Sequence, residues 1–573
     1  MKQTIEWLVG GQQGEGIDST GELFAKVLVK SGASVSTYKQ FMSRIKGGHT
    51  NYKLRASAEH SYYSGEKIDI LVCLDQETFD MHEHQLKKGS IAITEGEEIS
   101  ITETELGFIK AVFPLKSIAV KLGNSLAKNM ISLGISGSLA GLEVSYFEQL
   151  MEELFEKKGE KVIETNIKAV QYGYELAEQY LSTYRMPFGE QLKKKAMKPQ
   201  LFISGNEATA FGSFMAGCRY LSAYPITPAS EVMEWLAEEL PKVGGVVMQV
   251  EDEIAGICFA IGASYSGVRA MTSTSGPGFS LKSEAIGMAG MAEIPIVIVN
   301  SQRGGPSTGL PTKHEQSDLQ QMIHGTHGEI PRIVLYPATI EDAFYLASEA
   351  FNLADRYQCP VIVALDLGMS MNKMSVPAFD VDRVSIDRGK LLTDDEASDY
   401  EETHFKRYRL TEDGISPRPK PGMKHAVHTT SSNEHDEFGY ICEDVDNRIK
   451  MMKKRLEKIT DAQIQVPFKH NPALESEVIL VGMGSTYGAI KEAAAQLQVG
   501  HLHLQQIHPL PIKELEKIFE NKTIITVENN FNAQLLQVLK QGMPIHNRSQ
   551  SVVQFDGNPF TVETIITKVR EMM

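Results

Sequence analysis

The stretch VEDEIAGICFAIGASYSG, residues 250–267, decides the fold because it passes from three carboxylates into an uncharged helical pattern. An acidic side chain in the first helical turn stabilises a helix by about 0.3–1 kcal/mol, but one such cap is sufficient. Glu251 and Asp252 are therefore predicted to be polar residues that end the strand and cap the helix. The rest of the helix is apolar or small, which predicts burial between layers. Glu253 lies nearest its buried face, where a carboxylate is a candidate for proton transfer.

Short apolar runs alternate with helical patterns on both sides of this helix, which predicts sheets that are mostly parallel. The strand candidates are TIEWLVG (4–10), KIDILVCLD (67–75), GSIAITE (89–95), GGVVMQV (244–250), RAMTSTS (269–275), IPIVIVN (294–300), PRIVLYP (331–337), CPVIVALD (359–366), SEVILVGMG (476–484), VGHLHLQQI (499–507) and TIITVENN (523–530). The runs of the middle segment, 244–250 included, are predicted to be buried. The predicted fold class is α/β, with three α/β domains in series.

Breaks in composition place the domain boundaries. A chain of 573 residues is too long for a single core. The predicted divisions are an α/β domain at 1–185, a basic Pro/Gly-punctuated linker at 186–199, a second α/β domain at 200–371 and a third at 466–573. Residues 372–465 are polar and rich in turn residues, with almost no strand signal until the helical NRIKMMKKRLEKI. They are predicted to be an irregular excursion that packs on other domains or on a partner.

Composition excludes several function classes. The net charge of -16 argues against nucleic-acid binding as the main function. No uncharged apolar run reaches about 18 residues, so no membrane span is expected. The N-terminus lacks a signal-peptide pattern, and the five cysteines are far apart, which together favour a cytoplasmic protein with reduced thiols. No metal site is predicted in this chain, and His425, His428 and His435 are expected to be solvated.

Three further loops could carry chemistry. In SAYPITPASE (222–231), prolines bracket Thr227 and fix its backbone, although such a pattern alone is more often a rigid turn. In SQRGGPSTGLPTKHEQSDL (301–319), Arg303 follows a strand end and can bind a carboxylate or phosphate; a solvated arginine is equally compatible. In TSTSGPGFSL (272–281), Gly276 and Gly278 let the backbone approach a cofactor closely, but no P-loop lysine follows. The N-terminal GGQQGEG lacks the acid expected of a nicotinamide site.

Taken in order, these stretches resemble the 2-oxoacid:ferredoxin oxidoreductase family over essentially the whole chain. The resemblance is to an alpha subunit with a gamma domain fused at its N-terminus. It extends to MSRIKGGHTNYKLR from Met42, DGISPRPKPG, NEHDEFG and VENNFNAQL. It implies that residues 200–371 form a thiamine-diphosphate pyrimidine-binding domain and that the last domain is transketolase C-terminal-like. The family's diphosphate signature, Gly-Asp-Gly followed by Asn-Asn, is absent, so the chain resembles half an active site.

The resemblance also implies roles for individual residues. Glu253 matches the glutamate that hydrogen-bonds the cofactor's pyrimidine N1′, and Arg303 and Thr312 match groups around the 2-oxoacid, with Thr227 touching both cofactor and substrate. Catalytic roles fall to Glu253, Thr227 and Arg303. The matched cofactor-binding positions are Tyr224, Pro225, Ile226, Thr227, Glu253, Ser275 and Gly276. Candidates for coenzyme A in the gamma domain are Arg44, Lys46, Gly47, Gly48 and His49.

The same resemblance implies cofactors and partners. A beta subunit is expected to hold the diphosphate, Mg²⁺ and a [4Fe–4S] cluster, with ferredoxin as acceptor, coenzyme A as co-substrate and an (alpha–beta)₂ assembly. The expected reaction is oxidative decarboxylation of a 2-oxoacid to acyl-CoA and CO₂. 2-Oxoglutarate is favoured on overall resemblance, with pyruvate or a branched-chain 2-oxoacid as the alternative. A transketolase-like enzyme without an electron acceptor and a non-catalytic assembly subunit are the remaining alternatives.

Overall fold

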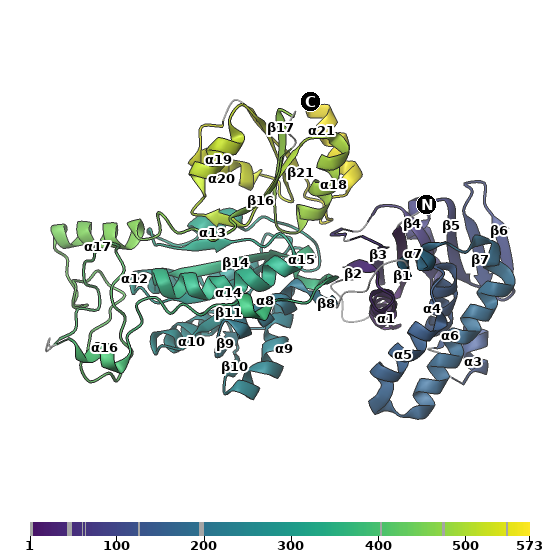
Figure 1. The fold of residues 1–573 in the computed structure, drawn as a ribbon, viewed down its shortest axis with the longest axis horizontal. Helices are drawn as coiled ribbons and strands as arrows, with labels where there is room; N and C mark the ends of the chain where they lie inside the picture. Colours follow the sequence, from purple (N-terminus) through teal and green to yellow (C-terminus); the bar gives the residue numbers. More distant parts are fainter. Residues whose placement is uncertain are drawn as a thin grey trace. The chain divides into compact units, whose positions relative to one another are not determined.

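The computed structural model of this protein describes residues 4–42, 48–59, 61–63, 65–123, 127–193, 200–400, 404–472, 476–545 and 548–573. Contacts divide the chain into two compact units. The first comprises residues 1–203 and 372–378, and the second comprises residues 204–371 and 379–573. Figure 1 shows strands and helices alternating along both units. The α/β class is therefore confirmed, and the described residues contain no helix long and apolar enough to cross a membrane.

The first unit contains a nine-stranded sheet. In spatial order its strands are β6 (Ser100–Glu103), β7 (Ile109–Phe113), β5 (Leu86–Glu95), β4 (Ile68–Cys73), β1 (Thr4–Gln12), β3 (His49–Ser57), β2 (Ser34–Gln40), β15 (Lys373–Pro377) and β8 (Gln200–Ser204). β1, β4, β5 and β7 are parallel, whereas β3 runs antiparallel to both β1 and β2. The expectation of a mostly parallel sheet holds for β1, β4, β5 and β7 but not for the rest of this sheet, where β3 pairs antiparallel with β1 and β2, β6 with β7 and β15 with β2.

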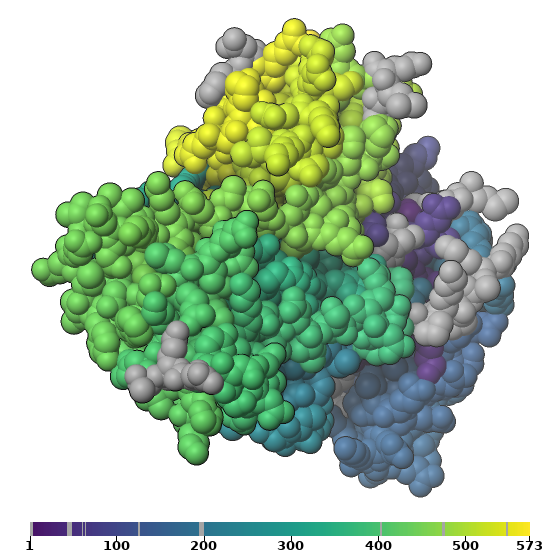
Figure 2. All heavy atoms as spheres, turned by 60° about the vertical axis from the view of Figure 1, so that its left-hand side comes forward, coloured from purple at the N-terminus to yellow at the C-terminus, as the bar shows by residue number. Residues whose placement is uncertain are grey.

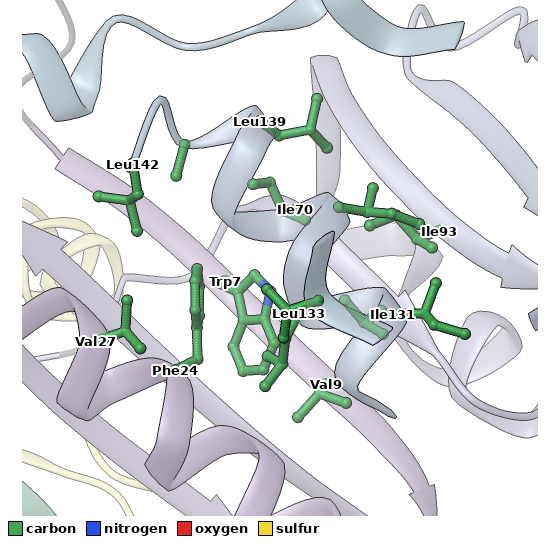
Figure 3. Close-up of a cluster of buried hydrophobic side chains, with 14 of the residues drawn as sticks. Trp7, Val9, Phe24, Val27, Ile70, Ile93, Ile131, Leu133, Leu139 and Leu142 are labelled. Atoms are coloured by element: carbon green, nitrogen blue, oxygen red, sulfur yellow. The ribbon is translucent and has the colours of Figure 1, made fainter. Parts of the chain in front are cut away.

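Helices bury this sheet's apolar side chains. They are α1 (Ile17–Lys30), α2 (Gln76–His82), α3 (Leu115–Lys121), α4 (Ala127–Leu139), α5 (Val144–Phe155), α6 (Glu160–Leu181) and α7 (Phe188–Leu192). Figure 3 shows Trp7 of β1 between Phe24 of α1 and Leu133 of α4. The rings of Trp7 and Phe24 lie 4.8 Å apart, and Trp7 donates a hydrogen bond of 3.0 Å to the hydroxyl of Ser136. The indole is thus buried with its only polar atom satisfied.

Small residues set the distance between α4 and α6. A Cβ at Gly134 would lie 2.1 Å from the Val170 carbonyl oxygen, and one at Gly173 would lie 2.2 Å from the Ile131 carbonyl oxygen. Each glycine therefore lies directly against the backbone of the other helix. No side chain fits at these two positions unless the helices move apart.

The second unit contains a seven-stranded sheet ordered β10 (Val246–Gln249), β9 (Tyr220–Ala223), β11 (Ala270–Thr274), β12 (Ile296–Gln302), β14 (Pro360–Asp366), β13 (Ile333–Leu335) and β19 (Gln506–His508). All pairs from β10 to β13 are parallel. β12 and β14 are fully buried, as the sequence predicts. The prediction of burial is wrong for β10: it is an edge strand, and Val246 is 47% exposed.

A five-stranded sheet completes the second unit. Its order is β16 (Phe468–Asn471), β18 (Gly500–Leu504), β17 (Val478–Met483), β20 (Thr523–Glu528) and β21 (Ser549–Val553). The helices of this unit are α8 (Gly205–Met215), α9 (Ser230–Glu239), α10 (Glu253–Tyr265), α11 (Gly276–Leu281), α12 (Ser283–Met291), α13 (Leu319–His324), α14 (Ile340–Tyr357), α15 (Leu367–Met371), α16 (Asp394–Ser398), α17 (Val445–Glu457), α18 (Tyr487–Leu497), α19 (Ile512–Phe519), α20 (Gln534–Gly542) and α21 (Val562–Met572). β19 leaves its neighbours in sequence and pairs antiparallel with β13, so one strand joins the two sheets.

Residues 379–444 carry little regular structure, as predicted, but they are held by buried charges. Asp355 of α14 accepts from Arg269 at 2.9 Å and from Arg418 of this segment at 2.7 Å. Glu293 binds Lys454 and Lys458 of the α17 region at 2.6 and 2.7 Å, and its pKa is held well below the usual range because these cations outweigh burial. In Figure 2 the light-green atoms of this region form a continuous surface. The excursion therefore packs on the second unit.

Two details of this region depart from the sequence expectations. Residues 373–377 form β15, a strand that pairs with β2 in the first unit's sheet, because pairing with a distant strand leaves no local signal. His435 is buried rather than solvated, with its ring 3.9 Å from that of Tyr408, and His428 hydrogen-bonds the Ala426 carbonyl. Burial lowers the pKa of both histidines. They are packed side chains that stabilise the segment.

Candidate active site

The carboxylate triplet separates in the way the sequence predicts. Asp252 is the N-cap of α10, and its side chain accepts a hydrogen bond of 2.8 Å from the Ala255 N–H. Glu251 is exposed. Glu253 is the first residue of α10 and is 8% exposed. Among the described residues no group hydrogen-bonds its carboxylate, which leaves a buried acceptor available at the carboxyl ends of β9 and β11.

The first residues of α11, which follow β11, pack against two carboxylates. A Cβ at Gly278 would lie 2.6 Å from Glu253 Cγ and 2.8 Å from its Oε1. A Cβ at Gly276 would lie 2.8 Å from Asp318 Oδ2. Ser275, the N-cap of α11, is fully buried, and its hydroxyl has no hydrogen-bond partner among the described residues. The two glycines and the buried serine therefore line one polar cradle.

Arg303 lies at the carboxyl end of β12 and joins the loop Pro225–Pro228 to this cradle. Its guanidinium donates to the Thr227 carbonyl at 2.8 Å and to the Thr308 carbonyl at 3.3 Å. It is 8% exposed, its Nε has no partner, and within the described residues no carboxylate lies within ion-pair distance. Burial lowers its pKa, while Asp318 and Glu253 oppose that effect. A buried guanidinium without a paired anion is costly, and its fork geometry can bind a carboxylate in two hydrogen bonds.

The remaining predicted positions line the same end of the sheet. Tyr224, Pro225 and Ile226 connect β9 to the Thr227–Pro228 peptide, which is cis, and Tyr224 is 39% exposed. Thr312 is half-buried in the loop that returns from Gly309 towards Lys313. No hydrogen bond of the described residues ties the Thr312 side chain to Arg303, so its substrate role remains a prediction.

Two further residues of the cradle escaped the sequence analysis. Asp318 accepts from Asn300 Nδ2 at 3.0 Å, and burial raises its pKa to about 6. Lys282 is fully buried, and its ammonium donates to the Glu253 carbonyl at 2.7 Å. Burial lowers the pKa of Lys282 to about 8, against the attraction of Glu253 and Asp252. Lys282 gave no sequence signal, because a lysine at a helix boundary is normally solvated.

The prediction that α10 is buried between layers holds for only one of its faces in the described residues of this chain. Its inner face is buried through Gly256, Ile257 and Ala260, whereas Ile254 and Phe259 are 51% and 50% exposed. Burial on all sides requires a second layer, and the described residues of this chain supply none over that face. Leu281 of α11 is also exposed, at 53%.

The predicted coenzyme A positions fall in the first unit. Arg44, Lys46 and Gly47 lie outside the described residues. Gly48 has a φ of 95°, and His49 begins β3 with Nε2 3.1 Å from Nε2 of His82. Burial lowers the pKa of both histidines, to about 4 for His82. The structure therefore places His49 in a neutral, buried pair at the end of β1 and β4.

Known proteins resemble this chain over nearly its whole length. Residues 212–454 match the family model described as pyruvate flavodoxin/ferredoxin oxidoreductase, thiamine diphosphate-binding, and residues 6–176 match pyruvate ferredoxin/flavodoxin oxidoreductase. The 2-oxoacid:ferredoxin oxidoreductase subunit alpha of a Sulfolobus species is 33% identical, covering 97% of this chain and 95% of its own length. The chain belongs to the 2-oxoacid:ferredoxin oxidoreductase alpha-subunit family. Members of this family are oxidoreductase enzymes whose alpha subunits work with a partner subunit.

Two further relatives extend the match. The 2-oxoglutarate oxidoreductase subunit KorA of Mycobacterium tuberculosis is 29% identical over 98% of this chain and 91% of its own. The 2-oxoglutarate:ferredoxin oxidoreductase of Magnetococcus marinus, solved with 2-oxoglutarate, coenzyme A and succinyl-CoA bound, is 34% identical with a TM-score of 0.91 and full coverage of both chains. The expected family and the α/β fold with a thiamine diphosphate-binding domain are thus confirmed.

The cradle fits the aminopyrimidine half of thiamine diphosphate. The buried Glu253 carboxylate can accept a hydrogen bond from a ring N–H. The Ser275 hydroxyl, which has no partner among the described residues, is a further polar contact. Any side chain at Gly276 or Gly278 would fill the space held by the two carboxylates. Among the described residues no group of histidine, cysteine or carboxylate side chains could hold a metal ion.

Proposed function

We propose that this chain is the alpha subunit of a 2-oxoglutarate:ferredoxin oxidoreductase that uses thiamine diphosphate and coenzyme A. The observation that carries the proposal is the pairing of a free buried carboxylate, Glu253, with an anion-free buried guanidinium, Arg303, at one end of the sheet. The first suits the cofactor pyrimidine and the second suits the carboxylate that every 2-oxoacid has. The bound cofactor supplies the carbon chemistry of decarboxylation.

The residues of this chain would orient and enclose the cofactor and the substrate. Glu253 would hold a proton at the pyrimidine, Tyr224–Thr227 would line the site of the ring, and Arg303 with Thr227 and Thr312 would orient the 2-oxoacid. Solvent exclusion strengthens each of these charge interactions. His49 and Gly48, with Arg44, Lys46 and Gly47, belong to the proposed coenzyme A cleft.

The exposed apolar face of α10 is the proposed seat of the beta subunit. Ile254, Phe259 and Leu281 are each at least half exposed beside the cradle. An apolar helix face exposed to water is unfavourable. A partner that covers this face would bury its apolar side chains and complete the active site. That partner carries the diphosphate, Mg²⁺ and a [4Fe–4S] cluster, and it passes electrons to ferredoxin. The assembly is (alpha–beta)₂ and cytoplasmic.

The test is a substrate panel on the co-expressed pair. Activity is measured as coenzyme A-dependent reduction of ferredoxin or a viologen with 2-oxoglutarate, pyruvate and branched-chain 2-oxoacids. Glu253→Gln is expected to lose at least ~10²-fold in kcat, whereas the matched Glu251→Gln, with its exposed side chain, keeps the wild-type rate. A pair that prefers pyruvate overturns the substrate, and a wild-type rate in Glu253→Gln overturns the role of Glu253.

A further inference from the structure

Asp318 occupies a helix N-cap but does not cap its helix. It precedes Leu319, the first residue of α13, and aspartate is among the residues that most often cap the N–H groups there. Its side chain caps none of them, and its own N–H donates to Gln302 Oε1 at 3.0 Å. The carboxylate instead accepts from Asn300 and fills the space where a Cβ of Gly276 would lie. It is thereby directed towards the cradle.

The segment Gly276–Gly278 thus packs against two carboxylates, with Asp318 at the first glycine and Glu253 at the second. Arg303 is the cation that both influence, and Asp318 has the larger effect. Yet within the described residues Arg303 forms no ion pair and donates only to backbone carbonyls. Asp318 therefore compensates the guanidinium from outside ion-pair distance, while the guanidinium remains available to a ligand.

We propose that Asp318 is a positioning residue that takes up one proton when the carboxylate of a 2-oxoacid binds Arg303. The inference rests on the proposed function, which assigns that carboxylate to Arg303. The proton comes from solvent and goes to the Asp318 carboxylate, and no covalent bond of the substrate changes. The ionised form balances the charge of the empty site, and the neutral form avoids two anions beside one cation.

The charged groups around Asp318 support this direction. The pKa of Asp318 is raised to about 6, chiefly by burial; the Asn300 hydrogen bond lowers it, Glu315 raises it and Arg303 lowers it. A bound carboxylate cancels the effect of Arg303, so the pKa of Asp318 rises on binding. The other titratable groups are Glu253, which acts on Arg303, and Tyr336, whose pKa Asp366 and Asp318 help to raise.

The sign of the pH dependence follows. Binding raises the pKa of Asp318, so affinity is highest when Asp318 is already protonated and falls as pH rises. The fall reaches at most tenfold per pH unit between the free and the bound pKa. For the wild-type holoenzyme, KM for 2-oxoglutarate is expected to rise about 3- to 10-fold from pH 6 to pH 8.

The experiment measures KM and kcat against pH for the assembled holoenzyme. Asp318→Asn mimics the protonated acid, so its KM is expected to stay near the low-pH wild-type value throughout. Asn300→Ala removes the hydrogen bond that favours the ionised form, so the rise in KM moves to higher pH. Glu284→Gln, an exposed carboxylate on α12, is the matched control and keeps the wild-type profile.

The outcomes separate the two proposals. A wild-type KM that does not change with pH, or an Asp318→Asn profile that still rises as the wild type does, overturns the inference about Asp318. Arg303→Met is expected to raise KM at least ~10²-fold at every pH, through loss of the charge-assisted hydrogen bonds to the substrate carboxylate. An unchanged KM in that variant overturns the carboxylate site itself.

Discussion

Replacing Gly278 by alanine tests the cradle by adding one methyl group beside Glu253. The added Cβ would lie 2.6 Å from Glu253 Cγ and 2.2 Å from Thr274 Oγ1, whereas ordinary contact begins at 3.4 Å. The glutamate side chain must therefore move by about 0.8 Å unless the helix moves. A displacement near 1 Å at a catalytic group costs about 10²-fold in rate, which corresponds to about 2.7 kcal/mol of activation free energy.

The assay compares kcat of the assembled enzyme with the melting temperature of each variant. Gly278→Ala is expected to fall about 10²-fold in kcat, while overpacking costs the fold about 1–3 kcal/mol. Gly287→Ala on α12 is the matched control, because its Cβ would meet nothing within 4 Å. It should keep the wild-type kcat and gain up to about 1 kcal/mol of stability. A Gly278→Ala enzyme with wild-type kcat would refute the placement of Glu253.

Three other changes probe separate parts of the chain. Lys282→Met removes the buried donor to the Glu253 carbonyl and should lower kcat about tenfold with little change in KM. A variant with wild-type activity would show that the first turn of α10 does not depend on this hydrogen bond. Glu293→Gln leaves two lysines of α17 unpaired and should cost about 3–5 kcal/mol in denaturant unfolding at pH 7. Because the pKa of Glu293 is depressed in the folded protein, the wild type should lose this stabilisation as pH falls below about 4.5. A Glu293→Gln variant whose stability falls with acid as steeply as that of the wild type would contradict this. Gly134→Ala, with a Cβ 2.1 Å from the Val170 carbonyl oxygen, should lower the melting temperature of the first unit. Gly123→Ser meets no neighbour within 4 Å and bears only the strain of its φ of +87°, so it should lower the melting temperature less.

The predictable parts of the fold have local signals. The continuous apolar runs of β12 and β14, and the Asp252 cap followed by an uncharged helix, are written in a few adjacent residues. The motif order around Thr227, Glu253 and Arg303 was sufficient to indicate the family. These features depend on side-chain periodicity and capping, which act over one or two turns of chain.

The features that escaped prediction depend on distant parts of the chain. β15 pairs with β2 more than three hundred residues earlier in the sequence, and no periodicity announces it. Asp318 looks like a helix cap, since nothing local shows that its carboxylate faces Gly276 instead. The exposed half of α10 has the sequence of a buried helix face. An apolar composition predicts that a face is shielded from water, but it does not identify the molecule that covers it.

The buried charges that attach residues 379–458 have a consequence for exchanging parts between relatives. The described part of this segment contains a small apolar cluster formed by Leu392, Ala397, Phe405, Met423 and Ala426. Its attachment depends on matched charges: Asp355 binds Arg418 of the segment, and Glu293 binds Lys454 and Lys458. A graft of this segment from a homologue therefore brings the cations but not the two acids. Chimeras will fold only when Asp355 and Glu293 have counterparts in the recipient, so the segment and its two anchors behave as a single exchangeable module.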